Sequence, residues 1–284
     1  MLDLVLAIIF SGLLFIVFTL FKKINIDVFQ AIVFNYIIAF TTGMILSPVE
    51  INTGEILQQT WFPGTLFLGF LFIVVFNIMG KTAQVNGLTV ASVASKMSLI
   101  VPVLFGILFF NESIHFKKLL GIFLALTAVY FVSKKDSGQL RFDSLLLPCL
   151  LFIGAGTIDT GMNFIQRFYV PQNDTAIFSA FTFLTAFSIG ILILSYRIFR
   201  KQTGFHFKNI LGGIILGVPN FFSMFYMIKA LQTKNMESAT IFTLLNIGVI
   251  LFTTILGLLF FQEKLSKQNF AGIIIAIIAL FLVR

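Results

Sequence analysis

Long apolar segments alternate with short polar ones along the whole chain. Each apolar segment holds roughly 20 residues, which is the length an α-helix needs to cross the hydrocarbon core of a bilayer. A β-barrel would instead show alternating segments of about ten residues, and runs such as IIIAIIALFLV do not alternate. We therefore expect an all-α integral membrane protein with ten transmembrane helices. The predicted spans are 2–21, 28–46, 64–80, 87–110, 117–133, 144–166, 174–196, 208–230, 238–261 and 268–283.

The composition supports a lipid environment. Hydrophobic residues make up 58% of the 284 residues and charged residues only 11%, against about 25% charged in soluble domains. The connecting segments are too short for a separate soluble domain. The net charge of +8 comes from basic residues at the span ends, which favours membrane-topology signals over nucleic-acid binding. The first span, 2–21, lacks a basic leader and a cleavage site, so we do not expect a signal peptide.

The second half of the sequence repeats the first at a shift of 151 residues. LFFNE, ending at Glu112, aligns with LFFQE, ending at Glu263. We therefore predict two five-helix repeats, 1–135 and 142–284. Because five is odd, the second repeat enters the membrane in the opposite sense, as in many secondary transporters with a site between their halves. The other aligned pairs include Gly106 with Gly257, Gly121 with Gly272, Ala125 with Ala276, and Ala128 with Ala279.

Lys96 is the most informative residue for function. It lies about 13 Å into its predicted span, where a lysine costs several kcal/mol unless it faces water or a partner. Ser92 shares its helix face, and the repeat predicts a matching polar stripe with Thr243 and Asn246. We expect these residues to line a cavity, the alternative for Lys96 being a structural ion pair.

Asp159 is the only acidic residue deep in a predicted span, and Asn163 shares its face. It could pair with Lys96 or take up a proton, or it could lie at the headgroup level near the helix end. Asn77 and Asn220 are further cavity candidates, although an asparagine in a span also joins neighbouring helices.

The sequence offers little for catalysis. It has two histidines and one cysteine, and no motif of a zinc protease, a P-loop or a serine hydrolase. We therefore expect no enzyme, no catalytic residue, no metal and no cofactor. Any active transport would use an ion gradient or substrate exchange. Glu112 and Glu263 follow spans directly, so each is expected to stabilise the N-terminus of the next helix.

The segment ASVASKMSLIVPVLFGILFFNES, with its counterpart ending in LLFFQEKLSKQNFAGIIIAIIAL, resembles the EamA-like members of the drug/metabolite transporter (DMT) superfamily. Pro102 and the helix glycines Gly121 and Gly272 match that pattern. Asn111 and Gln262 replace its glycine before glutamate, and Thr253 replaces the second proline. The resemblance implies a permease with a central cavity between two repeats and with both termini in the cytoplasm.

These observations together predict a secondary-active transporter of a small metabolite in the cell membrane, that is, a bacterial inner or plasma membrane. Lys96 favours an anionic or zwitterionic substrate, and Asp159 allows protons as a coupling partner; lipid is the surrounding partner. The alternative is a non-transporting membrane scaffold or accessory subunit, which would leave a lysine on a repeated polar stripe unexplained.

The orientation can be tested with fusions. Six Lys and Arg residues lie on the side that holds both termini and twelve on the other, and the positive-inside rule then places the termini outside, opposite to the family pattern. We expect a C-terminal alkaline-phosphatase fusion to be active in the periplasm. An inactive phosphatase fusion beside a fluorescent GFP fusion would contradict this orientation.

Overall fold

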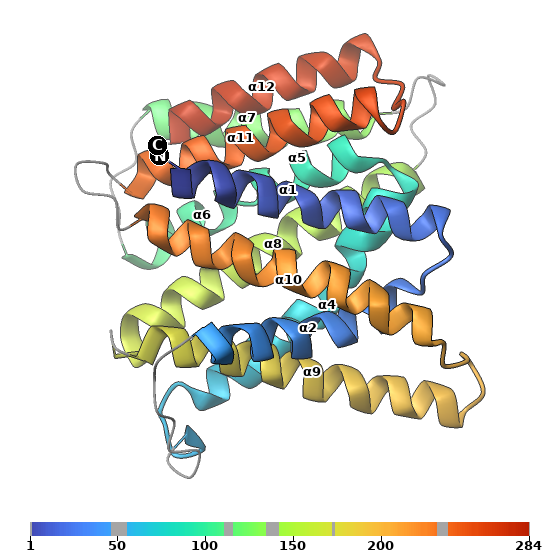
Figure 1. Ribbon diagram of the computed structural model, residues 1–284. Helices are drawn as coiled ribbons and strands as arrows, with labels where there is room; N and C mark the ends of the chain where they lie inside the picture. The colour runs from blue at the N-terminus through green and yellow to red at the C-terminus, as the bar shows by residue number, and fades with distance from the viewer. Residues whose placement is uncertain are drawn as a thin grey trace. The chain divides into compact units, whose positions relative to one another are not determined.

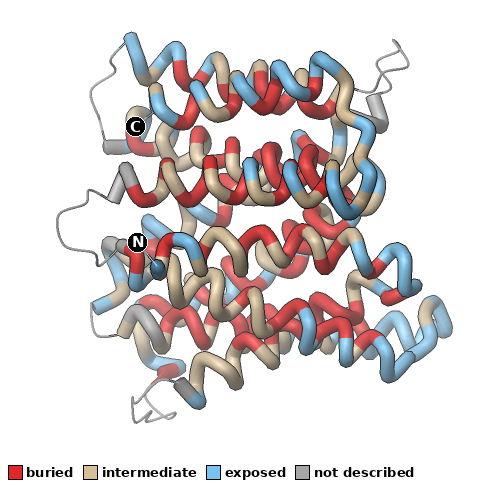
Figure 2. Tube along the Cα trace, turned by 45° about the horizontal axis from the view of Figure 1, so that its top comes forward, coloured by how far each residue is buried: buried red, intermediate tan, exposed pale blue. Residues whose placement is uncertain are grey.

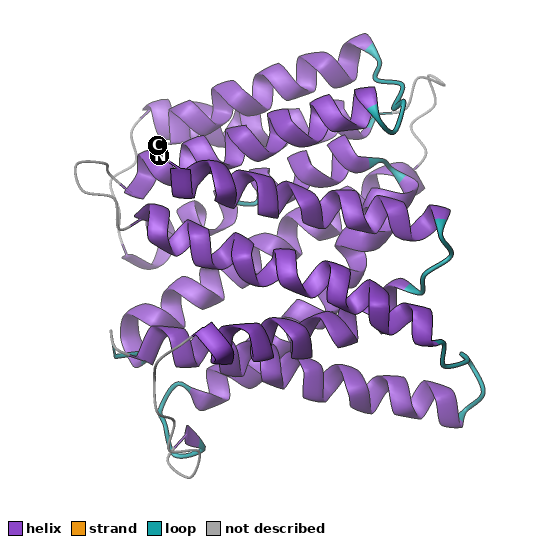
Figure 3. Ribbon diagram, viewed as in Figure 1, coloured by secondary structure: helices purple, strands orange, loops and turns teal. Residues whose placement is uncertain are grey.

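The computed structural model describes residues 2–46, 56–110, 116–134, 142–171, 174–231 and 238–283. Within these ranges the regular elements are helices, with no strand (Figure 3). Figure 1 labels them. They are α1 (Leu2–Lys23), α2 (Val28–Leu46), α4 (Phe62–Val85), α5 (Leu88–Met97), α6 (Ile100–Phe110), α7 (Phe116–Ser133), α8 (Phe142–Tyr169), α9 (Thr175–Phe199), α10 (Phe207–Leu231), α11 (Ser238–Leu259) and α12 (Lys267–Val283).

The ten predicted spans all coincide with described helix. Within the described residues, nine segments are long and apolar enough to cross a membrane, and Lys267–Leu282 is a shorter apolar helix. One expectation was wrong in detail: the span 87–110 is not a single helix but consists of α5 and α6, separated by a turn at Ser98 and Leu99. Pro102 explains the break, because a proline cannot donate to the carbonyl four residues before it and its ring pushes that carbonyl away.

The described helices form two compact units. Unit 1 is Met1–Leu20, Ile78–Thr157 and Phe222–Arg284, and unit 2 is Phe21–Asn77 and Ile158–Phe221. Each unit therefore draws on both halves of the sequence. The predicted divide between the halves, near 136–141, lies outside the described residues.

Helices at equivalent positions of the two halves pack against each other. In unit 1, α7 packs along α12 and α5 packs on α11; in unit 2, α2 packs on α9. The aligned small residues are buried in both copies, so the close packing uses the same positions twice. They are Gly121, Ala125 and Ala128 in α7, and Gly272, Ala276 and Ala279 in α12.

Polar groups tie α12 to the end of α7. The Asn269 Oδ1 accepts from the backbone N–H of Ser266, 2.9 Å away, which caps the start of α12. Its Nδ2 donates to the carbonyls of Val132, at 2.7 Å, and Lys134, at 3.0 Å. One asparagine therefore satisfies groups at the beginning of one helix and at the end of another.

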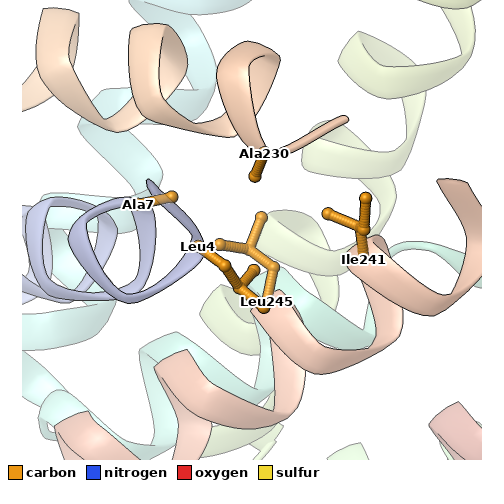
Figure 4. Close-up of a cluster of buried hydrophobic side chains, with 5 residues drawn as sticks. All are labelled: Leu4, Ala7, Ala230, Ile241 and Leu245. Carbon is orange, nitrogen blue, oxygen red and sulfur yellow. The ribbon is translucent and has the colours of Figure 1, made fainter. Parts of the chain in front are cut away.

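Unit 1 also contains an apolar cluster that joins α1, α10 and α11 (Figure 4). Leu4 and Ala7 contribute from α1, Ala230 from α10, and Ile241 and Leu245 from α11, and all five are buried. Because lipid is as apolar as these side chains, their contribution is close packing more than exclusion of water.

Unit 2 is held by aromatic packing and by buried amides. Tyr36 is fully buried among phenylalanines, and its hydroxyl donates to the carbonyl of Phe72 at 2.9 Å. At the start of α2, the side chain of Gln30 donates to the Gly204 carbonyl at 2.8 Å and accepts from Asn209 at 2.9 Å. These bonds join α2 to the loop before α10 and to α10 itself.

Figure 2 marks the exposed positions of the described helices, and large apolar side chains occupy many of them. On α7 the exposed side chains recur every three to four residues, at Leu119, Phe123, Leu126 and Tyr130, and so occupy one face. The buried face with Gly121 lies opposite. Such an exposed apolar stripe is what a helix presents to lipid.

The close approach of α7 and α12 predicts the effect of enlarging Gly272. A Cβ at this position would lie 2.8 Å from the backbone nitrogen of Val132, so a side chain there forces the helices apart. We expect Gly272→Val to destabilise the protein by about 1–3 kcal/mol, measured as a lower melting temperature in detergent. Ile274→Ala, on the exposed face of α12, is the control; equal melting temperatures for the two variants would contradict this packing.

Candidate functional site

Lys96 lies in the last turn of the half-helix α5. The other residues of α5 are buried except Ser95, so Ser95 and Lys96 are the two half-buried positions. The C-terminal carbonyls of a helix carry partial negative charge, which stabilises a nearby cation. Lys96 therefore belongs to the helix turn beside the break, where the helix end favours a positive charge.

The break itself is closed by local hydrogen bonds. Pro102 has no N–H to donate to the Ser98 carbonyl. This carbonyl instead accepts a hydrogen bond from the Val101 N–H at 2.9 Å. The Ser98 hydroxyl donates to the Ser95 carbonyl. Gly156 of α8 packs directly on this turn, since a Cβ there would lie 2.8 Å from the Ser98 oxygen. A larger residue at Gly156 would displace the turn that follows Lys96.

A buried chain of hydroxyls connects α5 with α11. The Thr253 Oγ1 lies 2.7 Å from the Ser92 Oγ, and the Ser92 hydroxyl donates to the Thr89 carbonyl at 2.9 Å. Ser92 is fully buried, and its hydroxyl is engaged between the two helices. Thr253 aligns with Pro102 in the repeat. Unlike a proline, a threonine has a backbone N–H, and α11 is continuous through this position.

The carboxylate of Glu263 caps the start of α5. It accepts from the Leu88 N–H, from the Thr89 N–H at 3.2 Å and from the Thr89 hydroxyl at 2.7 Å. The expectation that Glu263 stabilises the next helix was therefore wrong: it stabilises an earlier one, while Ser266 and Asn269 cap α12. Glu112 lies outside the described residues.

Asp159 lies well inside α8, about 15 Å before the helix ends at Tyr169. Asp159 and Asn163 are both exposed side chains. They point in a different direction from the exposed apolar residues of α8, such as Ile153. Asp159 follows Ile153 by six residues, which turn a helix by about 240°. The helix therefore has two exposed faces, one apolar and one carrying these polar groups.

The remaining candidates are engaged or buried. The Asn77 Nδ2 donates to the Ile73 carbonyl of its own helix at 2.8 Å. The Asn220 Nδ2 donates to the Asn35 Oδ1 at 3.1 Å, between α10 and α2. Thr243 and Asn246 are buried on α11.

The structure divides the candidate residues between the two units. Ser92, Lys96, Thr243 and Asn246 belong to unit 1, and Asn77, Asp159, Asn163 and Asn220 belong to unit 2. Among the described residues, no group of three or more His, Cys, Asp or Glu side chains is placed to hold a metal ion.

Sequence reasoning missed the roles of three residues that contact α5 or the turn after it. Glu263 had a signal, the repeated FFxE, but it was assigned to the wrong helix. Gly156 and Thr253 gave no signal in a single sequence. A glycine that packs on a turn, or a threonine that bonds to another helix, cannot be told from other glycines and threonines in a span.

The sequence is similar to known proteins over nearly its whole length. A family model described as the EamA-like transporter family matches residues 1–134 and 146–284. A protein of Haemophilus influenzae, described as an uncharacterized protein, is 32% identical over 286 residues, which covers 98% of this chain and 96% of the relative. A solved structure described as a crystal structure of a protein has a TM-score of 0.58 at 13% identity, covering 97% of this chain and 95% of its own. That likeness concerns the fold alone.

The role of Pro102 in the break predicts the effect of restoring its N–H. In Pro102→Ala the new N–H can bond the Ser98 carbonyl, so α5 and α6 can join into one helix. We expect the amides of 98–103 to exchange hydrogen about tenfold more slowly, as measured by mass spectrometry. Unchanged exchange would show that packing against Gly156, and not the proline, maintains the break.

Proposed function

The chain belongs to the EamA-like transporter family, and from this membership we propose that it is a secondary-active carrier of a small anionic or zwitterionic metabolite. A multi-pass membrane transporter of the DMT type takes a small-molecule substrate. The family leaves open which molecule is carried and how the protein binds it.

Lys96 is the single observation that carries the proposal. A lysine within a span is costly unless it faces water or a partner, and this one is half-buried beside a helix break. Broken helices present their ends to substrates and ions in many transporters. We assign to Lys96 the task of neutralising a carboxylate or similar anionic group of the substrate.

Asp159 is proposed as the partner of this chemistry. A carboxylate exposed on a helix face separate from the apolar face is suited to a water-filled path, where it can exchange a proton with solvent. In the proposed mechanism Asp159 carries a coupling proton.

We place the substrate path in a central cavity between two inverted repeats. Support comes from the repeat in the sequence and from the packing of α2 on α9, α5 on α11 and α7 on α12, which are equivalent helices of the two halves. A pseudo-two-fold arrangement gives each half the same contact in opposite orientation. The cell membrane of a bacterium is the proposed location, in keeping with the bacterial relative.

A membrane scaffold or accessory subunit is the alternative from another class. It would need close helix packing, which the small residues of α7 and α12 provide, but it has no use for Lys96 beside a helix break. A carrier gives that residue a function.

A thermal-shift screen of the purified protein against pools of metabolites tests the proposal. A ligand at 100 times its Kd stabilises the folded state by about 2.7 kcal/mol, so we expect a raised melting temperature with at least one anionic or zwitterionic compound. Lys96→Gln should abolish this shift, because the neutral amide cannot offset the charge of the ligand, and Lys96→Arg should retain part of it. Asp159→Asn should weaken or decouple transport of the same compound in proteoliposomes.

The control is Lys264→Ala, which changes a lysine in an exposed position next to Glu263 and should leave the ligand shift intact. An equal shift in Lys96→Gln and wild type would remove Lys96 from binding while leaving the transporter family standing. The absence of a shift with every pool would favour the scaffold.

A further inference from the structure

We propose that Glu263 is a positioning residue, which fixes the half-helix α5 and through it the place of Lys96. The role in substrate binding rests on the proposed function of Lys96. The fixation of α5 stands on contacts within unit 1 alone. A residue from the second half of the sequence would thus determine where a functional group of the first half lies.

The first support is the number of groups that converge on one carboxylate. Two backbone N–H groups and one hydroxyl from the start of α5 donate to Glu263. A helix leaves its first four N–H groups without partners in the helix, and an anion there also interacts favourably with the helix dipole. Charged hydrogen bonds of this kind are roughly twice as strong as neutral ones.

The second support is the space made for the carboxylate. A Cβ at Gly87 would lie 2.6 Å from the Glu263 Oε1, and a Cβ at Gly257 would lie 2.6 Å from the Oε2. Gly87 has a φ of 103°, which side chains rarely allow. Two glycines from distant parts of the chain therefore border the same carboxylate.

The third support is the turn that directs Glu263 toward α5. Gln262 has a φ of 51°, a left-handed conformation that is uncommon outside glycine. The Glu263 N–H then bonds the Gly257 carbonyl at 2.9 Å, as at the ends of many helices. This turn places the Glu263 backbone against the last turns of α11.

A half-helix depends on such fixation more than a full span does. With ten residues, α5 is about 15 Å long and would be marginal as an isolated helix. Its far end is broken by the turn at Ser98 and Leu99. Glu263 at its start and the Thr253–Ser92 bond along its side join α5 to α11 and its following turn, and thereby fix the helix that bears Lys96.

The experiment uses Ser95→Cys as a reporter in a Cys149→Ser background. Position 95 is half-buried and adjacent to Lys96, so an anionic methanethiosulfonate should modify the introduced thiol faster than a cationic one does. Lys96→Gln, added to the reporter, calibrates how much of this rate ratio the lysine charge supplies. Hydrogen exchange of the first turn of α5 is measured on the same proteins.

Glu263→Ala should speed hydrogen exchange at the start of α5 about tenfold, because a strong N-cap is lost. It should also move the ratio of anionic to cationic modification rates toward that of Lys96→Gln. Gly257→Ala, which retains the charge but displaces the carboxylate, should do the same. Lys264→Ala is the matched control and should change neither. If Glu263→Ala does not fold, Glu263→Gln and Gly257→Ala carry the test.

Faster exchange with an unchanged reagent ratio would overturn the positioning role and leave Glu263 a structural cap. Unchanged exchange would overturn the cap as well. Neither outcome depends on a substrate. A Lys96→Gln protein that still binds the screened metabolite would instead refute the proposed function and leave the fixation of α5 intact.

Discussion

Every backbone N–H and C=O group within lipid must find its partner inside the protein, because the bilayer core offers no water. Continuous helices meet this constraint by themselves, and most spans of this chain are continuous. Among the described spans, the exception is the one that breaks between α5 and α6. Its Ser98 carbonyl bonds locally, and Glu263 supplies acceptors at the other end of α5. Hydrogen bonds that the half-helix cannot make within itself are therefore completed at the turn and by Glu263.

The same constraint explains why the spans could be predicted from the sequence. Length and apolar composition determine where a helix crosses the membrane, and α2, α7 and α12 begin and end within one or two residues of the expected positions. The aligned small residues were also visible, since Gly121 and Gly272 lie at matching places in the repeat. Their burial against a neighbouring helix follows from the need of apolar helices for close packing.

The contacts of α5 and of the turn after it could not be predicted in the same way. The proline that breaks the span was evident, but a kink and a full interruption look alike in one sequence. The partner of Glu263 was assigned to the nearest helix along the chain, whereas Thr89 lies 174 residues earlier. Lys96 and Asp159 were found as candidates because a charge in a span is rare enough to be informative by itself.

We propose that residue 96 faces a water-filled substrate path, from a half-helix that contacts within unit 1 hold in place. The most direct measurement is the reactivity of Lys96→Cys, in a Cys149→Ser background, with a membrane-impermeant thiol reagent in lipid nanodiscs. Ile274→Cys, on the exposed apolar face of α12, serves as the lipid-facing reference. We predict rapid modification at position 96 and almost none at position 274. Equal inertness at both positions would contradict the account.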